Sequence, residues 1–103
     1  MGMILTGRRV TAREGFALGF VTEIVPQGQA LEAAKRWAGM ILECSPKAVR
    51  ASKQAVYRGQ GMPTLEQAMR TVFPAQQENI ESQDYIEGPK AFAEKRRPDW
   101  KNR

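Results

Sequence analysis

The sequence predicts an all-α protein with about five short helices and one brief extended segment. Three kinds of signal support this fold class: residues that cap helices, prolines suited to a first helical turn, and apolar residues spaced three and four apart. A chain of 103 residues is one domain at most, so we expect a single helical domain over residues 1–103.

The first predicted helix follows a capping box formed by Thr11 and Glu14, so it should begin at Ala12 and end at Gly19. The segment before it, Met1 to Gly7, is short and apolar. The segment Phe20–Val25 is β-branched and aromatic, which is typical of a short strand or an extended segment. Because no partner strand is evident, this segment can equally be a connector.

The centre of the chain contains two predicted helices. Residues 29–43 have the clearest amphipathic pattern, with apolar residues on one side and charged residues on the other. Ser45 and Pro46 then provide a cap and a first-turn proline for a helix that reaches about Arg58.

A loop at residues 59–63 separates these helices from the next one, which is capped by Thr64 with Gln67. Pro74 interrupts the helical pattern, so we expect a kink or break there, with residues 75–80 continuing as helix. The apolar face of the helix before the break comprises Leu65, Ala68, Met69, Val72 and Phe73.

The last segment is predicted to form two helices. Ser82 is a good N-cap, with Asp84 in the first turn, where negative charge suits the positive end of the helix dipole. Gly88 can close this short helix. Pro89 can then occupy the first position of a second helix. That second helix should stop near Arg97, because the proline that follows disfavours helical geometry in the residue before it.

Phe92 and Lys95 lie three residues apart in this last predicted helix, and would share one of its faces, with Arg96 beside them. An aromatic ring next to cations would suit a flat heterocycle that carries a phosphate. The alternative interpretation is a phenylalanine packed in the core with solvated charges alongside it.

Composition limits the classes of function. Sixteen Lys and Arg against eleven Asp and Glu give a net charge of +5, spread along the chain except for the run Lys95-Arg96-Arg97. Such a surface attracts phosphates without selecting nucleic acid, and we expect no nucleic-acid partner. No apolar run is long enough to cross a bilayer, so we expect no membrane partner. The single Cys44 fits a reducing compartment, and we expect a cytoplasmic protein.

Leu, Ile, Val and Phe together account for only 20 of the 103 residues, and 13 residues are Ala. This is near the lower limit for a chain that builds its own core. We therefore expect helices that complete their packing against other protein, either a further domain or another copy of the chain.

The chain lacks the residues that most catalytic sites need. It contains no His for a triad or a metal site, and no glycine-rich phosphate loop of the usual spacing. Cys44 would need a base to act as a nucleophile, and no Glu is paired with a second carboxylate for acid/base chemistry. We expect no catalytic residue and no metal ligand, and the chain alone should be inactive.

Two stretches resemble a known family. Residues 87–96, Glu-Gly-Pro-Lys-Ala-Phe-Ala-Glu-Lys-Arg, followed by Pro-Asp-Trp-Lys, are similar to the carboxyl end of the crotonase superfamily, the enoyl-CoA hydratases and isomerases. Residues 5–26 resemble the segment that follows the catalytic core of that family. The resemblance runs from about Met3 to Lys101.

The resemblance implies that the chain is the C-terminal helical module of a crotonase-like fold, without the N-terminal domain that carries the catalytic glutamates and the oxyanion loop. It implies that Phe92 and Lys95 contact the adenine and the ribose phosphate of an acyl-CoA substrate. No tightly bound cofactor is implied. The implied partners are further copies of the chain, in a trimer or a dimer of trimers.

The reaction implied by the resemblance is hydration of 2-enoyl-CoA thioesters, or the reverse dehydration, in fatty-acid or related acyl-CoA metabolism. Isomerase, hydrolase and decarboxylase relatives share this segment, so the sequence does not select the reaction. Two other classes stay open: a non-catalytic helical module for protein interaction, and a small basic nucleic-acid binder. The last is the weakest, because no recognised binding motif is present.

Overall fold

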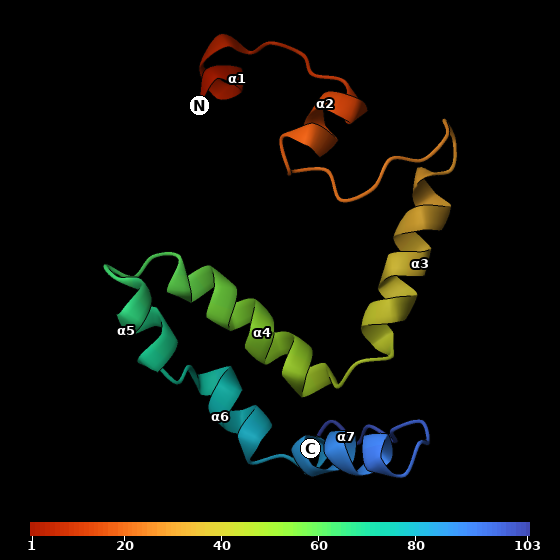
Figure 1. Cartoon of the computed structure of the whole chain (residues 1–103), viewed down its shortest axis with the longest axis vertical. Helices are drawn as coiled ribbons and strands as arrows, with labels where there is room; N and C mark the ends of the chain where they lie inside the picture. The colour runs from red at the N-terminus through yellow and green to blue at the C-terminus, as the bar shows by residue number, and fades with distance from the viewer. The chain divides into compact units, whose positions relative to one another are not determined.

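The computed structural model describes all 103 residues and contains seven α-helices and no strand (Figure 1). The predicted all-α class is confirmed, although the helices number seven rather than about five. The chain divides into two compact units, Met1–Trp37 and Ala38–Arg103, which are described separately. The prediction of a single domain stays a prediction.

The first unit contains α1 (Gly2–Thr6), α2 (Ala12–Ala17) and most of α3 (Ala30–Leu42). Helix α1 was not predicted, because its N-terminus has no side-chain cap to signal it. It ends at Gly7, whose φ of +63° is the left-handed conformation that glycine adopts readily.

The cap of α2 forms as predicted, since the Thr11 hydroxyl accepts the N–H of Glu14 at 3.1 Å. The second half of the box does not form: the Glu14 carboxylate instead pairs with Arg8 at 2.7 Å, and this hydrogen bond lowers the pKa of Glu14. The helix ends at Ala17, two residues before the predicted Gly19.

No strand forms in Phe20–Val25, so of the two predicted alternatives the extended connector is correct. Within it, the Glu23 carboxylate accepts the indole N–H of Trp37 at 2.8 Å and the guanidinium of Arg36 at 2.5 Å. These contacts tie the connector to α3 and lower the pKa of Glu23, with the Trp37 hydrogen bond as the larger cause.

The second unit is built around α4 (Pro46–Gly59), which packs against α5 (Leu65–Arg70) and α6 (Pro74–Ile80) (Figure 1). Helix α6 in turn contacts α7 (Gln83–Ala93). The start of α4 is as predicted, with the Ser45 hydroxyl accepting an N–H of the first turn at 3.3 Å.

The predicted break at Pro74 is confirmed, because α5 ends at Arg70 and α6 begins at Pro74. Val72 and Phe73, which were predicted on the apolar face of a helix, lie instead in the non-helical link. That link directs Phe73 inward, where it is 5% exposed. It is the largest buried apolar side chain of the protein.

The prediction of two helices at the end of the chain is wrong, because α7 is one continuous helix with Pro89 inside it. A proline disfavours helical geometry in the preceding residue by clashing with that residue's N–H and Cβ, and Gly88 has no Cβ. Trp100 packs beside Gly88, at a distance where an added Cβ would be in ordinary van der Waals contact with the ring, 3.4 Å away. The helix ends at Ala93 rather than near Arg97.

The core is small. The apolar side chains that are buried are Ala33, Ala51, Phe73 and Ala91. Three of these four are alanines, which remove little apolar area from water. None of the helices combines the length and the apolar character needed to cross a membrane.

Candidate functional site

The candidate site lies at the C-terminal end of α7, where the helix closes with a Schellman motif. The N–H of Arg96 donates to the carbonyl of Ala91 at 3.0 Å, and the N–H of Lys95 donates to the carbonyl of Phe92 at 3.2 Å. This motif places one residue in the left-handed conformation, and here it is Lys95, with φ of +52°. Glycine is the usual occupant, so the surrounding structure must hold Lys95 there.

Phe92 and Lys95 do not share a helical face as predicted, because Lys95 lies beyond the end of α7. Phe92 is in the last turn and is 87% exposed, so it is not packed in a core in this structure. Lys95 is also exposed, and its side chain forms no ion pair. Their contact with CoA stays a prediction.

Arg96, predicted as a second cation beside Phe92, forms ion pairs with two carboxylates. It pairs with both oxygens of Glu87, at 2.5 Å and 3.0 Å, and with Glu94 at 2.6 Å. These contacts raise the pKa of Arg96, Glu87 being the larger cause. A bidentate pair of this kind leaves little of the guanidinium for a ligand.

The Glu87 carboxylate binds the backbone of Asp99 as well as the side chain of Arg96. Its Oε1 atom also accepts the backbone N–H of Asp99 at 2.8 Å. The hydrogen bonds from Arg96 and then from Asp99 lower the pKa of Glu87 to about 2. The carboxylate is therefore ionised throughout the neutral range and joins α7 to the segment that follows it.

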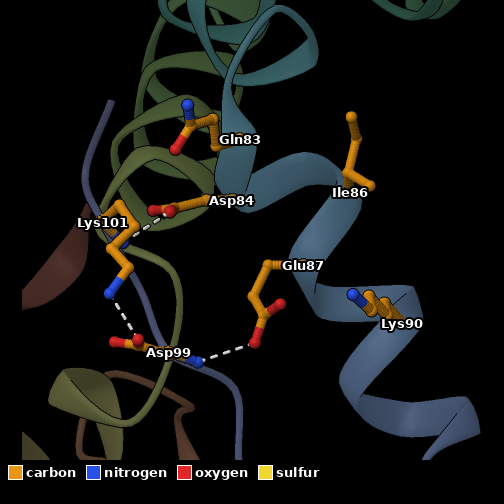
Figure 2. A pocket seen from close by; sticks show the side chains of 7 residues that line it. All are labelled: Gln83, Asp84, Ile86, Glu87, Lys90, Asp99 and Lys101. Atoms are coloured by element: carbon orange, nitrogen blue, oxygen red, sulfur yellow. Dashed lines mark hydrogen bonds and ion pairs between the residues drawn. The ribbon is translucent and has the colours of Figure 1, made fainter.

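A second carboxylate, Asp84, holds the last residues of the chain against the start of α7. It is 2% exposed and accepts the backbone N–H groups of Lys101 at 2.7 Å and Asn102 at 3.1 Å. The Ser45 hydroxyl donates to it at 3.3 Å. Figure 2 shows Asp84 and Glu87 on the same helix, each directed at this segment, residues 96–103, which we call the tail.

Further contacts fix the tail. The indole N–H of Trp100 donates to the carbonyl of Glu43 at 2.8 Å, and the guanidinium of Arg50 donates to the side-chain oxygen of Asn102 at 2.6 Å. The carbonyl of Arg103 accepts a first-turn N–H of α7 at 2.8 Å, which satisfies a donor that a helix start leaves free.

Sequence reasoning missed the roles of Asp84 and Glu87. It assigned Asp84 only to the favourable end of the helix dipole, and it gave Glu87 no role. The available signal was their spacing of three, which puts both carboxylates on one side of a helix. The two contacts span 17 and 12 residues, and no local pattern specifies them.

An open cavity of about 300 Å³ lies between α7 and the tail (Figure 2). It is lined by Gln83, Asp84, Ile86, Glu87, Lys90, Asp99 and Lys101. Each of its three carboxylates already has a partner, since Asp99 pairs with Lys101. No group of three or more His, Cys, Asp or Glu side chains is arranged to hold a metal ion. The absence of a catalytic residue stays a prediction.

Comparison with known proteins places this geometry in a family. The family model described as enoyl-CoA hydratase/isomerase matches residues 1–103. Among curated proteins, the carnitinyl-CoA dehydratase of Salmonella typhi is 35% identical over 108 residues, covering 98% of this chain and 40% of the relative. The chain thus spans about 40% of the length of the curated relatives it matches.

Solved structures agree with the sequence match. An enoyl-CoA hydratase from Bacillus anthracis superimposes with a TM-score of 0.87 and 34% identity, covering 99% of this chain and 39% of that one. An enoyl-CoA hydratase/isomerase from Mycobacterium paratuberculosis gives a TM-score of 0.85 and 33% identity, covering 93% and 38%. Because the family model covers every residue and the helices superimpose, the chain belongs to the enoyl-CoA hydratase/isomerase family.

Proposed function

We propose that the chain is the C-terminal part of a longer enzyme that acts on acyl-CoA thioesters, and that it provides the nucleotide end of the CoA site. The proposed reaction is hydration of a 2-enoyl-CoA, or the reverse dehydration, in fatty-acid or related acyl-CoA metabolism. The observation that carries the proposal is the end of α7, where Phe92 and Lys95 are both exposed.

The chemistry of the two residues fits the nucleotide. Adenine is a flat aromatic ring that can stack on a phenylalanine, and the ribose phosphate is an anion that a lysine ammonium can contact. The ring of Phe92 is 87% exposed and therefore accessible for stacking. The ammonium of Lys95 has no carboxylate partner, because Glu87 and Glu94 form ion pairs with its neighbour Arg96.

The catalytic step is proposed to belong to another part of the enzyme. Addition of water to an enoyl thioester needs an acid/base group and backbone donors for the thioester oxyanion. The carboxylates in the cavity beside α7 are all engaged with the tail. A reading frame upstream of this chain that encodes two catalytic glutamates and an oxyanion loop would support the proposal, and its absence would contradict it.

Lys95→Ala in the full-length enzyme tests the role of this chain. The ribose phosphate is far from the reacting carbons, so its contact contributes equally to ground state and transition state. Removing such a contact raises KM and leaves kcat nearly unchanged. We expect KM for crotonyl-CoA to rise by about fivefold to thirtyfold, the range for an exposed charge-assisted contact.

The control substrate is a crotonyl-pantetheine thioester, which lacks the nucleotide and should show no change in KM. The control variant is Lys53→Ala, which removes an exposed lysine of α4 and should behave as the unmodified enzyme with both substrates. Equal losses on both substrates for Lys95→Ala would mean that Lys95 is structural, and would contradict the proposed contact.

We also propose that the chain assembles with further copies of itself, as a trimer or a dimer of trimers. The support is the exposure of large apolar side chains: Leu42 is 81% exposed, Met69 is 79% exposed and Leu65 is 76% exposed. Apolar surface of this extent on several helices is typical of a face that other protein covers.

We expect the 103-residue chain to self-associate at about micromolar concentration, because association is the available way to cover these side chains. Sedimentation velocity over a concentration series measures this directly. A single monomeric species across the series, with cooperative unfolding, would show that the exposed apolar side chains are tolerated in water and would contradict the proposal.

A further inference from the structure

The loop that presents Lys95 is fixed at both of its ends. On the helix side, the Schellman motif sets the conformation of Lys95 itself. On the tail side, the Glu87 carboxylate binds Arg96, which directly follows Lys95, and the backbone of Asp99. One carboxylate of α7 therefore closes the loop that starts at Lys95.

These contacts of Glu87 stabilise an unfavourable backbone conformation at Lys95. A residue with a Cβ is disfavoured at φ of +52°, and such residues persist where the surrounding structure determines them. The hydrogen bonds of the Schellman motif are backbone contacts at a helix end, where helices fray. The contacts of Glu87 are charge-assisted and reach across the loop, so they oppose fraying at this position.

We propose that Glu87 is a positioning residue for the phosphate-binding lysine: by holding Arg96 and Asp99, it keeps Lys95 in the left-handed conformation that presents its ammonium to the ligand. This inference rests on the proposed function of Lys95. It adds a residue that acts on the nucleotide through Lys95 and not by contact.

The sign of the effect separates positioning from simple electrostatics. Glu87 is an anion that contacts Arg96, the neighbour of the proposed phosphate-binding Lys95, so its charge alone should repel the ligand. Neutralising it would then strengthen phosphate binding. If Glu87 instead positions Lys95, neutralising it should weaken phosphate binding. The two explanations predict opposite changes from one substitution.

The test is Glu87→Gln in the protein at its full natural length, titrated with adenosine 3′,5′-bisphosphate. Glutamine keeps the volume of Glu87, but its amide group meets the Arg96 guanidinium with a donor where an acceptor is needed. We expect the dissociation constant to rise by about fivefold. Hydrogen exchange at the Asp99 and Arg96 amides should accelerate in the same variant.

Glu94→Gln is the matched control. This substitution removes the same charge as Glu87→Gln. The Glu94 carboxylate also contacts Arg96, at 2.6 Å, but it makes no contact with the tail backbone. Bisphosphate binding to this variant should be unchanged or slightly tighter. Binding to Glu87→Gln that equals or exceeds that of the unmodified protein would overturn the positioning role.

A double-mutant cycle with Lys95→Ala separates this proposal from the one it rests on. If Glu87 acts through Lys95, the double variant should bind no worse than Lys95→Ala alone. Additive losses would overturn the positioning role and leave the Lys95 contact standing. Unchanged binding in Lys95→Ala would instead contradict the proposed function of that lysine.

Discussion

Phe73→Ala should lower the free energy of unfolding of the 103-residue chain by about 3 kcal/mol or more. Phe73 is 5% exposed and is the one large apolar side chain that is buried. Its ring lines a groove of about 500 Å³ together with Ala55 of α4 and Ala68 of α5, so its removal enlarges a space that already exists. The other buried apolar residues are alanines and cannot fill the cavity.

The measurement is urea denaturation followed by circular dichroism. Because the helices of the second unit share so small a core, we expect much of its helical signal to be lost even without urea. Phe92→Ala is the matched control: it removes the same side chain from a site that is 87% exposed and should change stability by less than about 0.5 kcal/mol. Equal midpoints for the two variants would show that Phe73 does not organise the core.

Helix starts were predictable from the sequence because capping is local. A side-chain oxygen and an N–H three residues later decide each start, and both lie in one short stretch. Four predicted caps form. In each, a side-chain oxygen accepts the N–H of the residue three positions later, and the capping residues are Thr11, Ser45, Thr64 and Ser82. The break at Pro74 was predictable for the same reason, since the missing donor and the fixed φ belong to the residue itself.

The course of α7 departs from the local sequence signals. Pro89 stays inside the helix because Gly88 before it has no Cβ to hinder helical geometry, and Trp100, 12 positions further along the chain, packs beside that glycine. The end of α7 is a Schellman motif without a glycine, so the usual sequence signal for a left-handed residue is missing at Lys95.

The sequence predicts residues for the candidate site, whose contact with CoA stays a prediction, but it does not predict their geometry. Phe92 and Lys95 were identified by spacing and by family resemblance. They do not share a helical face, because α7 ends at Ala93, before Lys95. Asp84 was assigned only to the helix dipole, and Glu87 was assigned no role. Their functions depend on backbone N–H groups of the tail, which any residue type can provide, so no side-chain pattern marks the partners.

Asp84→Ala should release the tail and lower the free energy of unfolding by about 2 kcal/mol. The Asp84 carboxylate is 2% exposed and accepts the N–H groups of Lys101 and Asn102, at 2.7 Å and 3.1 Å. Alanine leaves both donors and the hydroxyl of Ser45 without this partner. Departure of the tail from α7 hydrates those donors and also breaks the hydrogen bond between Trp100 and Glu43.

Two measurements report directly on release of the tail. Exchange of the Lys101 and Asn102 amides should accelerate in Asp84→Ala, and the fluorescence of Trp100, measured in a Trp37→Phe background, should shift to longer wavelength as its ring becomes hydrated. Asp84→Asn should give an intermediate result, because an amide retains one acceptor oxygen where the carboxylate has two.

Asp99→Ala is the control, since it removes a carboxylate from the tail itself without removing the Asp99 N–H that Glu87 accepts. The Asp99 side chain is 72% exposed and pairs only with Lys101, so the loss should be within about 0.5 kcal/mol. If Asp84→Ala behaved like Asp99→Ala in stability, exchange and fluorescence, the other contacts of the tail, with Glu87, Glu43, Arg50 and the first turn of α7, would be enough to hold it. The buried carboxylate would then have no part in fixing the loop that follows Lys95.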